Sequence, residues 1–181
     1  ADVLEGEEGD DLLEGDAGND RLYGGAGVNV LRGGEGSDLL VSNAAADQLI
    51  GGTGHDIYHL VSGLATVSED ANGGIDTIQL APSASLAFQA PDQVENVQIL
   101  DDFYLEPTQR VDLVGNVLDN QLSGPNQLDG QGGNDILIGV GDNTFLFDRG
   151  YGQDIVRMGM QTYARSGLDQ ILFGAEIAPG D

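Results

Sequence analysis

Residues 24–32 read GGAGVNVLR, and residues 33–41 continue without a break as GGEGSDLLV. Both segments place glycines first, a small carboxylate or amide sixth and a large apolar residue eighth. An α-helix, with about 3.6 residues per turn, does not reproduce a period of nine. The same period runs through the first third of the chain, where large apolar residues stand nine apart: Leu4, Leu13, Leu22, Leu31, Leu40, Leu49 and Tyr58. The sequence is therefore organised around a nonapeptide repeat.

Each repeat divides into a turn of six residues and a strand of about three, such as Arg21–Tyr23. A strand this short is not stable alone, so it must pair with a strand one full coil away. With two nonapeptides per coil, alternate repeats form one column, and the eighth residue points into the core from both sheets. We therefore predict an all-β fold over residues 1–59, a right-handed parallel β-roll of the β-solenoid class.

The sixth position of the repeat supplies candidate metal ligands. Glycine-rich turns can aim carbonyl oxygens at one point, and turns 18 residues apart can each add a carboxylate. Together they offer the roughly six to eight oxygen ligands that Ca²⁺ prefers. We expect several Ca²⁺ ions, held by a first column of Asp2, Asp20, Asp38 and Asp56, a second column of Asp11, Asn29 and Asp47, and the turn glycines Gly15, Gly18, Gly24, Gly27, Gly33, Gly36, Gly51 and Gly54. The second column is poorer, because Asn29 is neutral and residues 42–47 contain no glycine, so weaker or empty sites are expected there.

The composition favours cations as partners. The chain of 181 residues has 31 acidic residues against six arginines and no lysine, a formal charge of −25 on 18.8 kDa. This charge opposes compaction of the bare chain and argues against nucleic acid or an anionic membrane as a partner. Cysteine is absent, which excludes a disulfide scaffold and thiolate metal sites. We find no long apolar run and no signal-peptide-like start, so we expect no membrane insertion. We interpret the chain, which begins in mid-repeat, as part of a larger protein.

The nine-residue period disappears after residue 59. We interpret residues 60–110 as longer β coils that continue or cap the roll, with strands expected near 64–67, 77–80, 85–88 and 94–100 and a loop at 101–107.

A second, degenerate nonapeptide block is expected over residues 111–156. Only residues 130–138, GQGGNDILI, form a good repeat, and Asn120, Asn126 and Asn143 stand where aspartate is expected. Asp135 and Asp154, 19 residues apart, are the best candidate metal ligands of this block. Its expected apolar ladder is Leu113, Leu122, Leu128, Leu137 and Leu146. Burial would therefore hold this block together with few metal ions. Residues 157–181 are expected to begin a truncated C-terminal β segment.

The motif G-G-x-G-x-D-x-U-x, with U a large apolar residue, resembles the calcium-binding repeat of RTX (haemolysin-type) proteins. Residues 75–78, 94–100 and 115–124 resemble the segments that join one nonapeptide block to the next in large secreted RTX proteins, and residues 145–156 resemble the unit that closes such a block. The resemblance implies a bacterial calcium-binding module without catalytic activity of its own. It also implies export through a one-step, type I secretion machinery in the unfolded state, and folding outside the cell or at its surface on meeting Ca²⁺.

Two other interpretations of the chain stay open. It could be a structural or adhesive segment of a surface protein, or the non-catalytic part of an exported enzyme such as a lipase, protease or epimerase. Direct signs of catalysis are weak. His55 and His59 have the spacing of two zinc ligands on a helix but fall in a turn and a strand. Ser42 and Ser62 lack a nucleophile-elbow motif, and the carboxylate pairs recur too often to be a catalytic dyad.

Overall fold

The computed structural model describes residues 1–44, 46–61, 64–71, 73–82, 84–100, 109–148, 150–158 and 169–174. Over these ranges the chain forms sixteen strands and no helix, and hence no apolar helix of membrane-spanning length. Every strand pair whose register is given below is parallel, which confirms the predicted all-β solenoid fold. The chain divides into two compact units, Ala1–Ser83 with Pro91–Asn96, and Ala84–Ala90 with Val97–Asp181.

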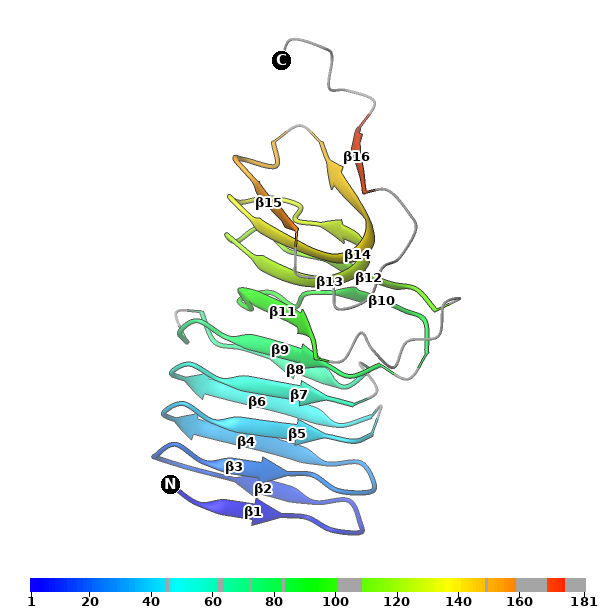
Figure 1. Cartoon of the computed structure of the whole chain (residues 1–181). Helices are drawn as coiled ribbons and strands as arrows, with labels where there is room; N and C mark the ends of the chain where they lie inside the picture. The colour runs from blue at the N-terminus through cyan, green and yellow to red at the C-terminus, as the bar shows by residue number, and fades with distance from the viewer. Residues whose placement is uncertain are drawn as a thin grey trace. The chain divides into compact units, whose positions relative to one another are not determined.

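The first unit is a stack of flattened coils, each contributing one strand to each of two sheets (Figure 1). One sheet runs in the order β1 (Val3–Glu5), β3 (Arg21–Tyr23), β5 (Leu39–Ser42), β7 (Ile57–Leu60) and β9 (Thr77–Leu80). The other runs in the order β2 (Leu12–Glu14), β4 (Val30–Glu35), β6 (Gln48–Thr53) and β8 (Thr66–Ser68). Each strand thus pairs with the strand after next, as two repeats per coil require.

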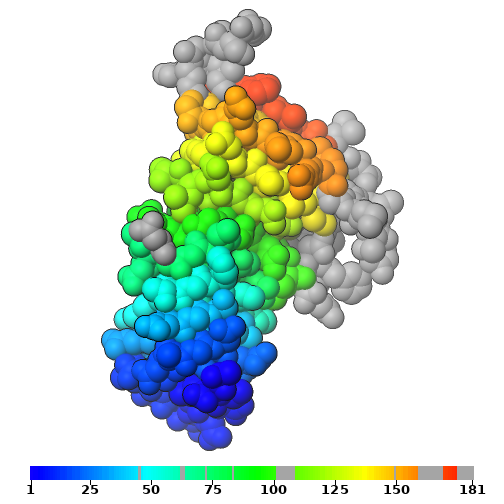
Figure 2. Space-filling model, turned by 90° about the vertical axis from the view of Figure 1, so that its left-hand side faces the viewer, coloured from blue at the N-terminus to red at the C-terminus, as the bar shows by residue number. Residues whose placement is uncertain are grey.

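The core of this unit is the predicted apolar ladder. Leu22 pairs in register with Leu40, and Leu31 with Leu49, each 18 residues away. All four side chains and that of Tyr58 are fully buried. Burying one leucine stabilises a fold by about 1.5–3 kcal/mol, so the ladder offsets part of the charge repulsion in every coil. The coils follow one another as bands from blue to cyan in Figure 2.

The turns stay close together because key positions have no side chain. Gly36 has a φ of 123°, and a β-carbon there would collide with the carbonyl oxygen of Gly18 in the preceding coil. The second position of the repeat is also left-handed, and in the repeat at residues 15–23 it is Asp16 with a φ of 61°. That conformation costs a non-glycine residue roughly 1–2 kcal/mol, so this turn, like the one with Glu7 at the same position, carries strain that the turns with Gly25, Gly34 and Gly52 avoid.

Two strands beyond residue 59 continue the two sheets of the first unit. β8 pairs with β6 at the regular spacing of 18, as in Leu49 with Val67. β9 pairs with β7 at a spacing of 20, as in Tyr58 with Ile78. The strand predicted at 77–80 is confirmed, whereas the one expected at 64–67 is observed at Thr66–Ser68. Two extra residues in this coil end the nine-residue period without ending the solenoid.

The second unit is built from less regular parallel coils. Its strands are β10 (Leu86–Gln89), β12 (Val111–Val114), β13 (Gln121–Asp129), β14 (Ile136–Phe147), β15 (Ile155–Met158) and β16 (Gln170–Phe173), while β11 (Asn96–Ile99) begins at the last residue of the first unit. Paired residues lie 25 apart between β10 and β12, 15 apart from Gln121 to Ile136, and 19 apart from Ile136 to Ile155. The expected loop at 101–107 and most of the C-terminal segment lie outside the described residues.

One position of the predicted ladder in the second unit is wrong. Leu113, Leu122, Leu128 and Leu137 are fully buried, but Leu146 is only half-buried and Phe145 is fully buried in its place. The cause is the length of β14. Along this continuous strand the odd-numbered residues from Leu137 to Phe145 face inward, so the period of two replaces the period of nine. Phe145 accordingly pairs in register with Leu128.

Candidate metal centres in the turns

The aspartates at the sixth position form a continuous ladder in the first unit. The backbone N–H of Asp20 donates to Oδ1 of Asp38 at 2.7 Å, and that of Asp38 donates to Oδ1 of Asp56 at 2.8 Å. The N–H of Asp2 donates to Asp20 in the same way. Each carboxylate is therefore anchored by one oxygen to the coil before it, and this leaves its other oxygen to be accounted for.

Those other oxygens are buried and lack a hydrogen-bond donor. This holds for Oδ2 of each of these aspartates: Asp11, Asp20, Asp38, Asp56, Asp76 and Asp135. In the repeat at residues 15–23 the oxygen lies beside the first glycine, since a β-carbon at Gly15 would be 3.0 Å from Oδ2 of Asp20 and 2.6 Å from the carbonyl oxygen of Gly33. Two acceptors face one another with no donor between them.

We call this arrangement a cradle: beside the first glycine of a repeat, Oδ2 of the sixth residue lies near a carbonyl oxygen of the next coil. The same cradle recurs along the unit. A β-carbon at Gly6 would lie 2.8 Å from Oδ2 of Asp11 and 2.5 Å from the carbonyl oxygen of Gly24. One at Gly33 would contact Oδ2 of Asp38 and lie 2.7 Å from the carbonyl oxygen of Gly51. A buried acceptor without a donor is costly, and a hard cation is the group that carboxylate and carbonyl oxygens satisfy together. The residues of these cradles thus fit Ca²⁺.

The glycines that were predicted to take part in metal binding occupy two different positions in the repeat. Gly15, Gly24, Gly33 and Gly51 lie where a side chain would fill the space beside the sixth residue of their own repeat. Gly18, Gly27, Gly36 and Gly54 have φ values from 122° to 136°, and for the last three the nearest atom to a β-carbon is a glycine carbonyl oxygen one coil earlier. The first set borders the cradles, and the second set keeps the turns stacked. Metal ligation by any of them stays a prediction.

The second column differs after Asp11. Oδ1 of Asn29 accepts from the N–H of Asp11 at 3.0 Å, so the amide Nδ2, a donor, is left beside Gly24. Oδ2 of Asp47 accepts from the Ser42 hydroxyl at 2.7 Å. A hydroxyl thus takes the place that a cation could occupy. These contacts agree with the expectation of weaker or empty sites in this column.

Asp135 and Asp154 are brought together in the second unit. The N–H of Asp135 donates to Oδ1 of Asp154 at 2.9 Å, and the N–H of Asn120 donates to Oδ1 of Asp135 at 2.7 Å. Oδ2 of Asp135 is buried without a donor and points at Gly130. This is the arrangement of the first-unit cradles, formed with coils of 15 and 19 residues instead of 18.

Burial and mutual repulsion alter the acidity of the ladder. Burial raises the pKa of Asp56 to about 6, and the neighbouring charges of Asp38 and Asp76 add to the shift. Burial likewise raises the pKa of Asp135 to about 7, and the charge of Asp154 contributes. Asp20 is the exception, because the N–H of Asp2 lowers its pKa. Carboxylates with raised pKa values gain most from a bound cation.

The ladder extends past the residues that the repeat pattern identified. The N–H of Asp56 donates to Oδ1 of Asp76 at 2.8 Å, and the N–H of Asp76 donates to Oε2 of Glu95 at 2.8 Å. These residues were missed because the spacing changes from 18 to 20 and then 19. The glycine pair Gly73-Gly74 ahead of Asp76 was the available signal.

A second ladder runs beside the first, one residue earlier in the repeat. The N–H of Ser37 donates to Oδ1 of Asn19 at 3.1 Å, and the N–H of His55 donates to the hydroxyl of Ser37 at 3.2 Å. His55 in turn accepts from the N–H of Ile75 through Nδ1 at 2.8 Å. His55 is therefore one rung of a structural ladder, and no second histidine is needed to explain its position.

Fold and turns together define a class of protein: a parallel β-solenoid whose stacked turns present buried, donorless carboxylates to cations. Residues 1–31, 23–58 and 122–146 match the RTX calcium-binding nonapeptide repeat, in four copies. These segments of the chain are RTX repeats, and with the solenoid they define a calcium-binding β-roll module. The RTX repeat is a structural calcium-binding unit and not a catalytic family. Comparisons with curated proteins and with solved structures find no match.

Proposed function

We propose that the chain is a calcium-responsive folding module of a secreted bacterial protein, which becomes ordered outside the cell when Ca²⁺ fills the turns. The observation that carries this proposal is the recurring pair of a buried carboxylate oxygen without a donor and a carbonyl oxygen of the next coil, as at Gly15 and Gly33. The formal charge of −25 adds to it, because such a chain resists compaction until cations neutralise it.

The proposed ligands follow from the cradles. Asp20 with the carbonyl of Gly33, and Asp38 with the carbonyl of Gly51, would hold ions in the first column. Asp135 would hold one in the second unit. Bound Ca²⁺ supplies the positive charge that these oxygens lack. The chain's own residues anchor the carboxylates through the N–H ladder and bury the apolar ladder beneath them, so metal affinity becomes folding free energy.

The same property would suit the chain to export in the unfolded state. A chain whose folded state needs millimolar Ca²⁺ would stay unfolded where Ca²⁺ is scarce, as passage through a type I secretion machinery requires. The rest of a larger parent chain would then carry any catalytic or adhesive activity.

The test is far-ultraviolet circular dichroism of the full chain. We expect little β signal in EDTA and a large gain on adding Ca²⁺. Mg²⁺ should have a much smaller effect, because it needs tighter octahedral sites and releases its water reluctantly. A full β signal in EDTA, unchanged by Ca²⁺, would refute the proposal.

A further inference from the structure

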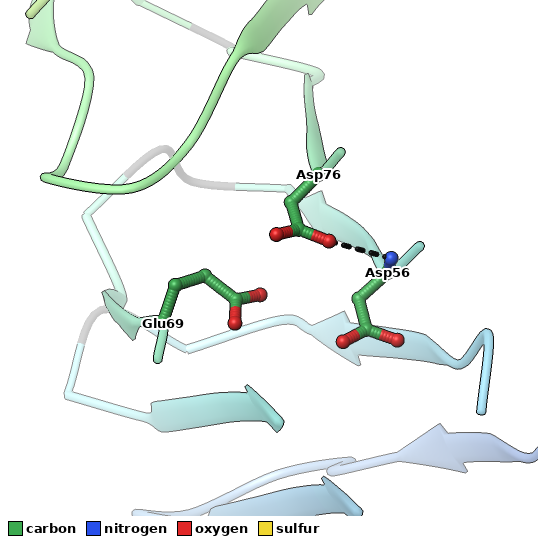
Figure 3. Close-up of side chains that lie close together, drawn as sticks. All are labelled: Asp56, Glu69 and Asp76. Atoms are coloured by element: carbon green, nitrogen blue, oxygen red, sulfur yellow. Dashed lines mark hydrogen bonds between the residues drawn. The ribbon is translucent and has the colours of Figure 1, made fainter. Parts of the chain in front are cut away.

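Three carboxylates from three successive stretches of chain meet just beyond the last nonapeptide. Asp56 precedes β7, Glu69 follows β8 and Asp76 precedes β9, and Figure 3 shows the three side chains turned toward one another. One oxygen from each lies within 4.8 Å of those from the other two. Oxygens bound to one Ca²⁺ at about 2.4 Å can be separated by at most about 4.8 Å. The spacing therefore suits a single shared ion.

Glu69 reaches this cluster because it stands where the first position of a further repeat would fall. It stands 18 residues after Gly51, directly after the register pair of Ile50 with Ser68. In the earlier coils this position is a glycine, whose carbonyl oxygen faces the first glycine of the preceding coil. At Gly51 the facing oxygen is instead Oε1 of Glu69, 2.5 Å from where a β-carbon would be. A charged oxygen thus replaces a neutral one at the same place.

The cluster points to a ligand through its unpaired oxygens. Asp56 and Asp76 are each only 1% exposed. Oδ2 of both, and Oε2 of Glu69, have no hydrogen-bond donor. The hydroxyl of Tyr58 donates to Oε1 of Glu69 and fixes its direction. Three carboxylates that each bury an oxygen without a donor this close together are strongly unfavourable unless a positive charge joins them.

Carbonyl oxygens complete the surroundings. A β-carbon at Gly73 would lie 2.7 Å from the carbonyl oxygen of Gly52, 3.1 Å from that of Asp70 and 3.3 Å from Oε2 of Glu69. Neutral oxygens thus lie around Gly73 together with the free oxygen of the Glu69 carboxylate. A mixture of carboxylate and carbonyl oxygens is the donor set of a hard cation, not of Zn²⁺.

We propose that Asp56, Glu69 and Asp76 form an additional site for a hard divalent cation, Ca²⁺ in the first instance. The site closes the first run of nonapeptide coils and lies partly outside it, since the first stretch that matches the RTX repeat ends at residue 58. It rests on the proposed calcium binding by the turns. Its three carboxylates make it the most negatively charged cradle in the described part of the chain, so it binds more tightly than the two-turn cradles.

The test compares Glu69→Gln with Glu5→Gln, which makes the same substitution at an exposed residue of the same unit outside the site. Calcium bound by the full chain is counted by equilibrium dialysis and its affinity measured by calorimetry. We expect Glu69→Gln to lose the tightest site, by at least about tenfold in affinity, because ligand charge sets Ca²⁺ affinity. Glu5→Gln should match the unmodified chain.

Tyrosine-sensitised Tb³⁺ luminescence provides a second measurement that does not depend on that variant folding. Because the Tyr58 hydroxyl touches Glu69, Tb³⁺ in the site should be excited through Tyr58. Tyr58→Phe should then lose most of the emission at one equivalent of Tb³⁺.

The outcomes separate this site from the proposed function. Glu69→Gln with unchanged Ca²⁺ affinity and number, or Tyr58→Phe with unchanged emission, overturns the site while calcium-induced folding stands. A chain that binds no Ca²⁺ at all overturns both.

Discussion

The backbone N–H of Asp38 donates to Oδ1 of Asp56, 18 residues further along the chain, at 2.8 Å. This bond fixes the carboxylate of Asp56 and leaves its Oδ2 buried without a donor. One residue type at one position thus performs two tasks. It ties neighbouring coils together and provides a buried oxygen that a cation can satisfy.

Replacing Asp38 should weaken the calcium-bound fold far more than replacing Asp47. Asp38→Asn keeps an oxygen for the N–H of Asp20 but puts an amide donor where Oδ2 faces Gly33. Loss of one site that is filled at about a hundred times its dissociation constant costs about 2.7 kcal/mol. Asp47→Asn can keep its contact with the Ser42 hydroxyl, so we expect a loss below about 1 kcal/mol. Denaturant unfolding in saturating Ca²⁺ measures the loss of stability in both variants. Equal losses would contradict the proposed difference between the two columns.

Acid should partly replace calcium. Burial raises the pKa of Asp56 to about 6 and that of Asp135 to about 7, against about 3.9 for an aspartate in an unfolded chain. Between these values the folded chain binds more protons than the unfolded chain. Folding in EDTA is therefore favoured as the pH falls from about 7 toward 4, and is lost as the pH rises.

Circular dichroism in EDTA between pH 8 and pH 5 checks the acid effect, and we expect the β signal to increase as the pH falls. In limiting Ca²⁺ the trend should reverse, because protons compete with the cation for the same carboxylates. A β signal in EDTA that decreases steadily toward pH 5 would show that these carboxyl groups are not buried as described.

Substitution of Phe145 should destabilise the fold more than substitution of Leu146, which is the reverse of what the nine-residue period predicts. Phe145 is fully buried and Leu146 only half-buried. Phe145→Ala should cost about 3–5 kcal/mol, and Leu146→Ala about 1 kcal/mol. Leu137→Ala, at a buried position of the same strand, is the control and should cost about 2–5 kcal/mol. Calcium-saturated unfolding curves provide the comparison, and a larger loss for Leu146→Ala would restore the original assignment of the ladder.

The sequence predicted the parts of this molecule that one period controls. Leu22 and Leu40 share one phase, so their pairing could be derived from spacing alone. Asp76 and Phe145 could not be placed that way. The first follows an insertion of two residues, and the second lies on a strand of 12 residues whose alternation overrides the period of nine. Glu69 stands at the first position of the period, where the repeat has glycine, and only its proximity to Asp56 in the structure indicated a role.

The distribution of bound ions between the two units is the last prediction. Among the described residues, the first unit contains donorless buried carboxylate oxygens on Asp11, Asp20, Asp38, Asp56, Glu69 and Asp76, and the second contains one on Asp135. Three other sixth positions of the second unit, Asn120, Asn126 and Asn143, carry asparagine, whose neutral oxygen cannot offset the charge of a cation. The second unit is instead held by buried side chains such as Leu128 and Phe145. A structure determined in Ca²⁺ should therefore place most ions between residues 1 and 76, with one or two near residues 135–154. Asp135→Asn should remove an ion from the second unit and leave those of the first in place. More ions in the second unit than in the first would show that the cation sites depend on the carbonyl oxygens of the turns and not on their aspartates.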